Sequence, residues 1–153
     1  MRPRGEIEFH ARTVEEALHI EDQPIRIPVE GLASDGTLFR GTVYVPEAFP
    51  YLMMKLHAFS DRKADANKDL GRHHALDTYA IVGMMTEAEF ERAKRLGVEN
   101  REEPHVERAR AIVGADFSSP TALGLLRLRE HPLFVAKFMT SDLVSVLAEL
   151  FPH

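Results

Sequence analysis

Two oppositely charged residues, Lys55 and Asp77, stand on or beside the apolar faces of consecutive predicted helices. In the first helix an apolar stripe recurs at helical spacing, and Lys55 lies to one side of it. In the second helix Asp77 falls near the centre of the predicted buried side, between Leu70, Ile81 and Met84. A buried carboxylate is costly unless a cation pairs with it. The pattern therefore predicts a Lys55–Asp77 ion pair beside a cleft, which would suit a phosphate or a metal ion.

The histidines of the second helix allow a separate metal site. His73 and Asp77 lie one helical turn apart on one face, and His57 of the first helix could face them. Adjacent histidines point about 100° apart on a helix, so His73 and His74 cannot easily bind the same ion. In the alternative arrangement His74 packs in the interior and His73 hydrogen-bonds Asp77.

Other chemical signatures are weak or missing. Tyr79 lies near Asp77, where it would either join the core or flank a bound nucleotide. The arginines of the C-terminal half alternate with glutamates, as on solvated helix faces. The sequence contains no nucleophile elbow, no P-loop and no glycine-rich dinucleotide motif. Hydrolase and dinucleotide-binding functions are therefore unsupported.

The composition is that of one soluble globular domain. The chain has 153 residues, of which 44% are hydrophobic and 28% are charged, and its formal charge is −5. This acidic balance argues against bulk nucleic-acid binding. The absence of cysteine excludes disulfides, thiolate metal sites and a cysteine nucleophile, and it fits the cytoplasm. No stretch approaches the length of apolar sequence that crosses a bilayer, so no membrane partner is expected.

The order of patterns predicts a single α+β domain, residues 1–153, with a β-rich part at 1–45 and a helical part at 46–153. Alternation predicts strands at 6–10, 25–29 and 38–45, the last two joined by a turn at 34–37. A short helix is predicted at 14–20, behind a capping box. The hairpin is expected to pack against a C-terminal helical bundle.

The helical part begins with a helix from Pro46 to about Ser60, followed by a charged loop at 61–69 and by the helix that carries Asp77 and ends near Met85. Thr86 opens a capping box that starts a third helix, which Gly97 is predicted to stop. Three more helices are predicted, at 104–114, 121–130 and 141–151.

A family resemblance rests on three short segments in the middle of the chain. They are Met-Lys-Leu-His-Ala-Phe-Ser-Asp-Arg at 54–62, Lys-Asp at 68–69 and His-Ala-Leu-Asp-Thr-Tyr at 74–79. These segments resemble the C-terminal motifs of the AbiEii-type nucleotidyltransferases, whose members include toxins of bacterial toxin–antitoxin systems. In that family a lysine helix is followed by an acidic helix, and both contribute to the active site. The resemblance therefore implies part of a nucleotidyltransferase-like fold.

The resemblance also implies a reaction and a role for each matching residue. The activity would be transfer of a nucleotidyl group from an NTP to an acceptor with Mg²⁺, and an antitoxin-like protein would be a partner. Lys55 would hold the phosphates, and Asp77 would act as base or bind the metal. Arg62 would add positive charge, with His73 and Tyr79 as further substrate-binding candidates. Such a set is coherent, because phosphoryl transfer depends mainly on positioning and charge neutralisation.

The chain also departs from the family pattern. It has no Gly-Ser dipeptide and no D-x-D carboxylate pair, and the nearest acidic pair at strand spacing is Glu6 and Glu8. A second alignment of the motif uses Asp69 in place of Asp77. The chain is then either the C-terminal portion of a longer enzyme or a degenerate relative. Two other functions stay open: a non-catalytic binding module that keeps the charged pair for structure, and a small metal-dependent enzyme using His73 and Asp77.

Overall fold

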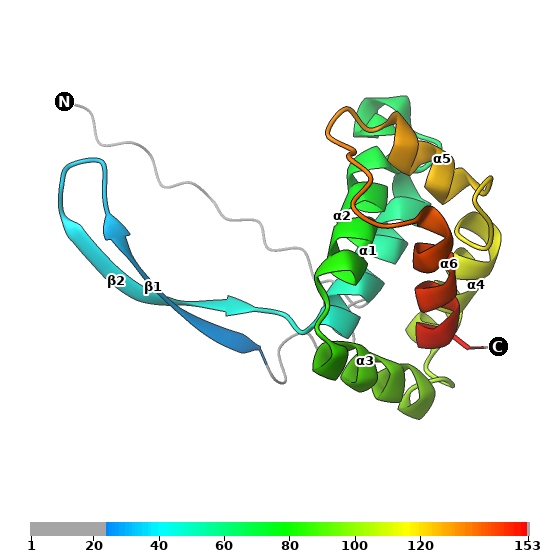
Figure 1. The fold of residues 1–153 in the computed structure, drawn as a ribbon, viewed down its shortest axis with the longest axis horizontal. Coiled ribbons are helices and arrows are strands. Elements are labelled where there is room, and N and C mark those ends of the chain that lie inside the picture. The colour runs from blue at the N-terminus through cyan, green and yellow to red at the C-terminus, as the bar shows by residue number, and fades with distance from the viewer. Residues whose placement is uncertain (1–23, 153) are drawn as a thin grey trace.

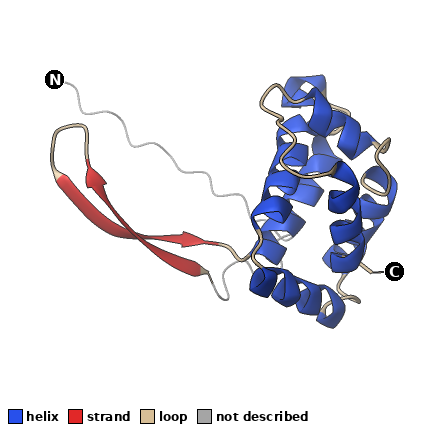
Figure 2. Cartoon of the chain, in the orientation of Figure 1, coloured by secondary structure: helices blue, strands red, loops and turns tan. Residues whose placement is uncertain are grey.

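The computed structural model describes residues 24–152, in which one antiparallel hairpin precedes six α-helices (Figure 1). The hairpin consists of β1 (Ile25–Leu32) and β2 (Leu38–Val45). The helices are α1 (Ala48–Arg62), α2 (Arg72–Met84), α3 (Glu87–Glu99), α4 (Pro104–Asp116), α5 (Leu123–Glu130) and α6 (Thr140–Leu150), with a short turn segment η1 (Ala66–Gly71) between α1 and α2. Figure 2 shows how completely strands and helices are separated. The α+β prediction is confirmed at this level.

The hairpin follows the predicted alternation. Residues paired directly across the two strands share one face of the hairpin. Ile27 pairs with Val43, and Ile25 pairs with Val45. The full apolar face consists of Ile25, Ile27, Val29, Phe39, Val43 and Val45. At the turn, Gly36 has a φ of 84°, a left-handed conformation that glycine adopts without a steric penalty. The predicted hairpin is therefore confirmed, with β1 extending to Leu32.

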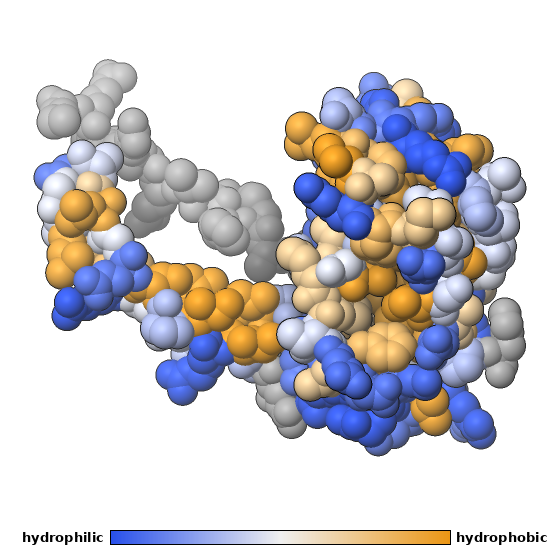
Figure 3. Space-filling view, viewed as in Figure 1, coloured by the Kyte–Doolittle hydropathy of each residue, from blue (hydrophilic) through white to orange (hydrophobic). Residues whose placement is uncertain are grey.

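The hairpin extends away from the helices instead of packing on them (Figure 1). Phe39 is 58% exposed and Tyr44 is 59% exposed. Figure 3 shows apolar side chains running along the hairpin away from the helical part. The prediction that the strands pack against the bundle is therefore wrong. Only the base of the hairpin reaches the helices, where Ile25 lines a small hollow together with Phe49 of α1 and Leu96 of α3.

The core belongs to the helices, with α1 at its centre in contact with η1, α2, α3 and α4. The predicted stripe of α1 is fully buried, since Leu52, Leu56 and Phe59 are all 0% exposed. The Phe59 ring meets Phe117 edge-on, with 5.0 Å between centroids. Burial of this stripe holds α1 in a fixed orientation, and so determines where Lys55 points.

The predicted start of α3 is confirmed, and its predicted end is wrong. Thr86 and Glu89 form the predicted capping box, each side chain accepting from the backbone N–H of the other residue. Gly97 does not stop the helix, which continues to Glu99. A Cβ at Gly97 would lie 2.2 Å from the carbonyl oxygen of Leu150. This glycine therefore permits close approach of the end of α6, and tertiary packing explains its presence.

The predicted strand at 6–10, with Glu6 and Glu8, and the predicted helix at 14–20 lie outside the described residues. Among the helices that the structure does describe, none combines the length and apolar character needed to cross a bilayer.

Candidate functional site

Lys55 of α1 and Asp77 of α2 meet as the sequence predicts. Lys55 Nζ lies 2.8 Å from Asp77 Oδ2. The Lys55 side chain is 16% exposed and that of Asp77 is 39% exposed, so the carboxylate is more accessible to water than the ammonium. Lys55 Nζ also lies 4.9 Å from the centroid of the Tyr51 ring, within range of a cation–π contact. Together these contacts fix the ammonium at the edge of the α1–α2 interface.

The sequence predicts Asp77 near the centre of the buried side of α2, and this prediction is wrong. The helix instead buries a face made of Ala75, Thr78, Tyr79, Ile81 and Val82. Met84, expected on the buried side, is 73% exposed. The difference has a physical reason: this rotation of α2 keeps the carboxylate in partial contact with water, so its charge is not fully desolvated.

The pKa of Lys55 is raised above its ordinary value. Burial acts first and alone would lower this pKa, but the hydrogen bond and negative charge of Asp77, aided by Tyr51, outweigh it. Lys55 is therefore a permanent cation near neutral pH. Such a group can neutralise phosphate charge but cannot serve as a general base.

A second polar contact joins the same two helices. Arg62, the last residue of α1, donates from its guanidinium to Nε2 of His74 on α2. Because Nε2 accepts this hydrogen bond, the ring proton lies on Nδ1, for which the described residues provide no hydrogen-bond partner. Two polar contacts thus join α1 and α2, one between Lys55 and Asp77 and one between Arg62 and His74.

The surroundings of His74 keep its imidazole neutral. Burial, followed by the positive charges of Arg62 and Lys55, lowers its pKa to about 4, although the negative charge of Asp77 acts in the opposite direction. At neutral pH the ring therefore accepts from Arg62 without adding a third positive charge. The site combines two cations, one carboxylate and one neutral imidazole.

Tyr79 lies in the core and does not flank the charged pair. Tyr79 is only 4% exposed, and its ring stacks on the Phe138 ring with 4.2 Å between centroids. Its hydroxyl donates to the carbonyl oxygen of Phe138 and accepts from the N–H groups of Lys137 and Phe138. Tyr79 therefore anchors the segment between α5 and α6, and it is not placed to bind substrate in this structure.

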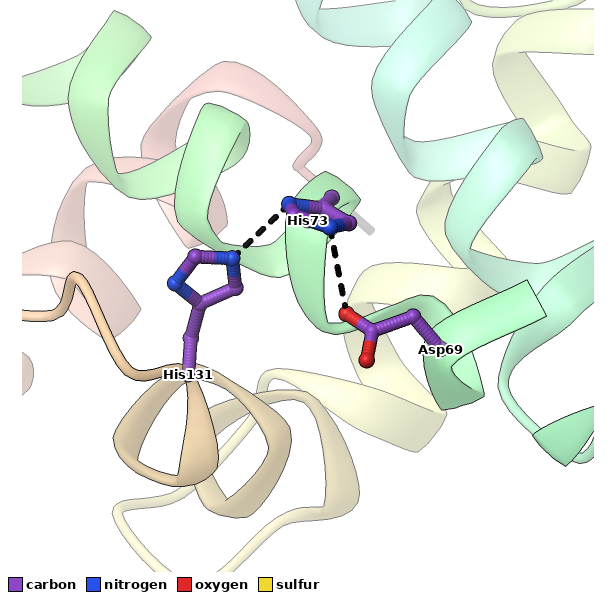
Figure 4. Close-up of side chains that lie close together, drawn as sticks. All are labelled: Asp69, His73 and His131. Carbon is purple, nitrogen blue, oxygen red and sulfur yellow. Dashed lines mark hydrogen bonds and ion pairs between the residues drawn. The ribbon is translucent and has the colours of Figure 1, made fainter. Parts of the chain in front are cut away.

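His73 does not pair with Asp77. Its Nε2 lies 3.5 Å from Asp69 Oδ2, and its Nδ1 lies 2.8 Å from Nε2 of His131 (Figure 4). These three residues are the group of potential metal ligands found in the described part of the chain, and Asp77 is not among them. The predicted His73–Asp77 metal site is therefore wrong, and Asp77 belongs to no group of three potential metal ligands among the described residues.

His57 also faces another direction than expected. It is 2% exposed, and its Nε2 lies 3.0 Å from the carbonyl oxygen of His105 on α4. His57 therefore connects α1 to α4.

A buried ion pair near the end of α1 was missed from the sequence. Lys63 Nζ lies 2.6 Å from Asp116 Oδ2, and the Asp116 side chain is 6% exposed. A signal was present, because Asp116 follows the buried Ile112 and Val113 at helical spacing and so continues their apolar stripe. The partner could not be read from the sequence, since the loop at 61–69 offers two lysines, Lys63 and Lys68, and spacing does not choose between them.

Two hollows lie elsewhere on the described surface. One is at the base of the hairpin, beside Phe49 and Leu96. The other lies between the end of α3 and α4 and includes Arg101 and Arg110. Neither is lined by Lys55 or Asp77, so the cleft predicted beside the pair is not one of these two.

Comparison of the chain with protein-family models, with curated proteins and with solved structures gives no match.

Proposed function

We propose that this chain is a nucleotidyltransferase-like protein in which Lys55, Arg62 and Asp77 contact the phosphates of an NTP and the acceptor. In this proposal the hairpin and helices are the later portion of a nucleotidyltransferase-like fold. The observation that carries the proposal is the 2.8 Å contact between Lys55 Nζ and Asp77 Oδ2, made at a position where both groups keep some exposure. It also agrees with the motif resemblance, in which these two residues belong to one site.

The chemistry follows from the protonation states. Lys55 is held as a cation, and Arg62 carries a second positive charge on the same helix two turns further along. Both can donate charge-assisted hydrogen bonds to phosphate oxygens, which are stronger than hydrogen bonds between neutral groups. A phosphate would take over part of the role that Asp77 now plays for Lys55. Binding therefore releases the Asp77 carboxylate to act on the acceptor.

In the reaction the acceptor hydroxyl oxygen forms a bond to the α-phosphorus and the bond from that phosphorus to the β-phosphate oxygen breaks. Asp77 accepts the hydroxyl proton, and pyrophosphate leaves. Lys55 and Arg62 stabilise the charge on the phosphate oxygens.

The resident Mg²⁺ that the resemblance implies does not fit the residues around Lys55. Mg²⁺ is bound through oxygen atoms in near-octahedral geometry, and proteins usually supply one or two carboxylates in addition to substrate phosphates. Asp77 is the carboxylate in contact with Lys55, which already compensates its charge. No step is therefore assigned to a protein-bound magnesium ion.

The binding half of the proposal is tested with Lys55→Ala. Loss of one charge-assisted hydrogen bond to phosphate corresponds to about 1.5–3 kcal/mol, so the affinity for ATP or GTP, offered as the magnesium complex, should fall by about 10- to 100-fold in equilibrium titration. Lys94→Ala is the matched control, since Lys94 is in an ion pair with Glu149 on another surface and its removal should leave nucleotide affinity unchanged. Equal nucleotide affinity in wild type and Lys55→Ala would refute the proposal.

The catalytic half is tested with Asp77→Asn. The substitution keeps the size of the side chain but removes the base, so nucleotide binding should persist or tighten while transfer to an acceptor is lost. Asp61→Asn is the control, because Asp61 pairs with Arg108 at an exposed position. If neither variant changes binding or transfer, and Lys55→Ala only lowers the free energy of unfolding, the pair is structural and the chain acts as a non-catalytic module.

A further inference from the structure

Asp69, His73 and His131 form a cluster separate from the Lys55 contact. One ligand atom from each side chain lies within 4.8 Å of the other two. Figure 4 shows His73 between the two other side chains, with Asp69 arriving from the turn before α2 and His131 from the end of α5. Residues distant in the sequence thus bring two imidazoles and one carboxylate to one place.

The backbone before α2 is held in an unusual conformation that positions Asp69. Asp69 and Leu70 have φ values of 58° and 52°, in the left-handed region that non-glycine residues rarely adopt. Gly71 follows with a φ of 73°. Three consecutive left-handed residues turn the chain so that Asp69 faces His73, while Arg72 also contacts the Asp69 carboxylate. Such strained backbone is concentrated at functional sites.

His131 is the fixed member of the cluster. It is 3% exposed, and its Nδ1 accepts the backbone N–H of Leu133 at 3.1 Å. A neutral ring that accepts at Nδ1 carries its proton on Nε2, which therefore donates to Nδ1 of His73. The two hydrogen bonds run in one direction, from Leu133 to His131 and from His131 to His73, whose Nε2 lies 3.5 Å from Asp69 Oδ2. A single proton thus occupies the space between the two imidazoles.

We propose that Asp69, His73 and His131 bind a divalent transition-metal ion of the Zn²⁺ class, which takes the place of the proton between the two histidines. Two imidazoles and one carboxylate are an established ligand set for Zn²⁺, with a fourth position left for water. Mg²⁺ is disfavoured because it prefers oxygen ligands. The site is independent of the nucleotide site proposed above.

The ligands must rearrange, because Asp69 Oδ2 faces Nε2 of His73 whereas His131 faces Nδ1 of the same ring. The Asp69 carboxylate therefore has to turn towards the space between the two rings. With Zn–N bonds of about 2.0–2.1 Å, tetrahedral nitrogen ligands lie about 3.3 Å apart, compared with the present 2.8 Å between the two rings. The His73 side chain is 67% exposed and can move by that amount. Bound through Nε2, His131 must carry its proton on Nδ1, so the N–H of Leu133 can no longer donate to it. Metal binding is therefore coupled to the segment that follows α5.

The test uses the whole chain, with Zn²⁺ affinity measured by competition with a chelating dye and Co²⁺ as a spectroscopic probe. Wild type should bind one ion. His73→Ala and Asp69→Asn should each weaken binding by more than about 10-fold, because loss of a direct ligand costs at least as much as loss of an outer contact. His105→Ala, a histidine on α4, is the matched control and should keep wild-type affinity, as should Lys55→Ala.

Two results would overturn the proposal: no one-to-one binding of Zn²⁺ or Co²⁺ at micromolar concentration, or unchanged affinity in both His73→Ala and Asp69→Asn while circular dichroism shows them folded. The exposed His73 is chosen over the buried His131 because its loss leaves the core intact. The amide resonance of Leu133 should shift on Zn²⁺ addition, and a fixed resonance in the metal-bound protein would refute the coupling to the segment after α5.

Discussion

Lys55 and His74 lie on the same helix pair and are both partly buried, but their pKa values move in opposite directions. Burial lowers the pKa of each, and for Lys55 the neighbouring carboxylate of Asp77 reverses the effect. For His74 the nearby charges of Arg62 and Lys55 are positive and add to the effect of burial. Neighbouring charges therefore decide which of the two groups stays ionised near neutral pH.

The lowered pKa of His74 predicts a pH dependence of stability. Because its pKa is about 4 in the folded chain and 6.5 in the unfolded chain, the unfolded state binds the proton first as pH falls. The free energy of unfolding should therefore decrease from about pH 6.5 down to about 4. The ring is only half-buried, so solvent screening weakens the effect of its charge. The expected loss in the free energy of unfolding is therefore about 1–2 kcal/mol, less than the full pKa shift would give.

Urea unfolding at pH 7 and pH 4.5 measures this dependence. In His74→Gln the pH-dependent loss should be smaller than in wild type by that amount. Arg62→Gln should reduce the loss in part, because one of the charges that lower the pKa is removed. An identical loss in wild type and His74→Gln would contradict the assignment.

At the scale of elements, helix orientation is set by apolar stripes and by close contacts. The α1 stripe was readable from spacing, and its burial places Lys55 beside α2. The end of α3 was not readable, because Gly97 normally indicates a helix stop. Here it accommodates Leu150 from a helix distant in the sequence.

Gly97→Ala should therefore destabilise the protein, even though alanine is the better helix former by about 1 kcal/mol. The added Cβ would lie 2.2 Å from the Leu150 carbonyl oxygen, and relief of that overlap must shift α6 away from α3. The expected loss is about 1–3 kcal/mol in the free energy of unfolding, measured by urea denaturation. Gly31→Ala, in open space on β1, is the control and should change stability little. A stabilised Gly97→Ala variant would show that α6 does not approach so closely.

At the scale of the whole molecule, the helical part carries the core and the hairpin adds little burial to it. Two phenylalanines illustrate the difference, since Phe59 is 0% exposed and Phe39 is 58% exposed. Single two-stranded hairpins are at best marginally stable in water, so most of the stability of the described chain belongs to the helices.

Phe59→Ala should cost about 3–5 kcal/mol, as expected for an aromatic side chain lost from a packed core. Phe39→Ala, the matched change on the hairpin, should alter the free energy of unfolding by no more than about 0.5 kcal/mol. Thermal and urea denaturation followed by helical circular dichroism measure both. A large loss in Phe39→Ala would mean that the apolar face of the hairpin is covered in solution.

The sequence by itself determined the kind and approximate limits of the elements in the described chain, because periodicity, turn residues and capping are local properties. It also identified the Lys55–Asp77 contact, since a charge beside an apolar stripe needs a nearby partner. Asp116 showed the same signal, but its partner Lys63 did not follow from spacing.

Only the tertiary structure decided which distant groups meet. His131 joins His73 because α5 ends beside α2, and Tyr79 is buried because the segment between α5 and α6 supplies partners for its hydroxyl. The direction of the hairpin was likewise beyond local signals. An alternating strand shows that one face is apolar, but what that face contacts depends on long-range packing, which no short segment encodes.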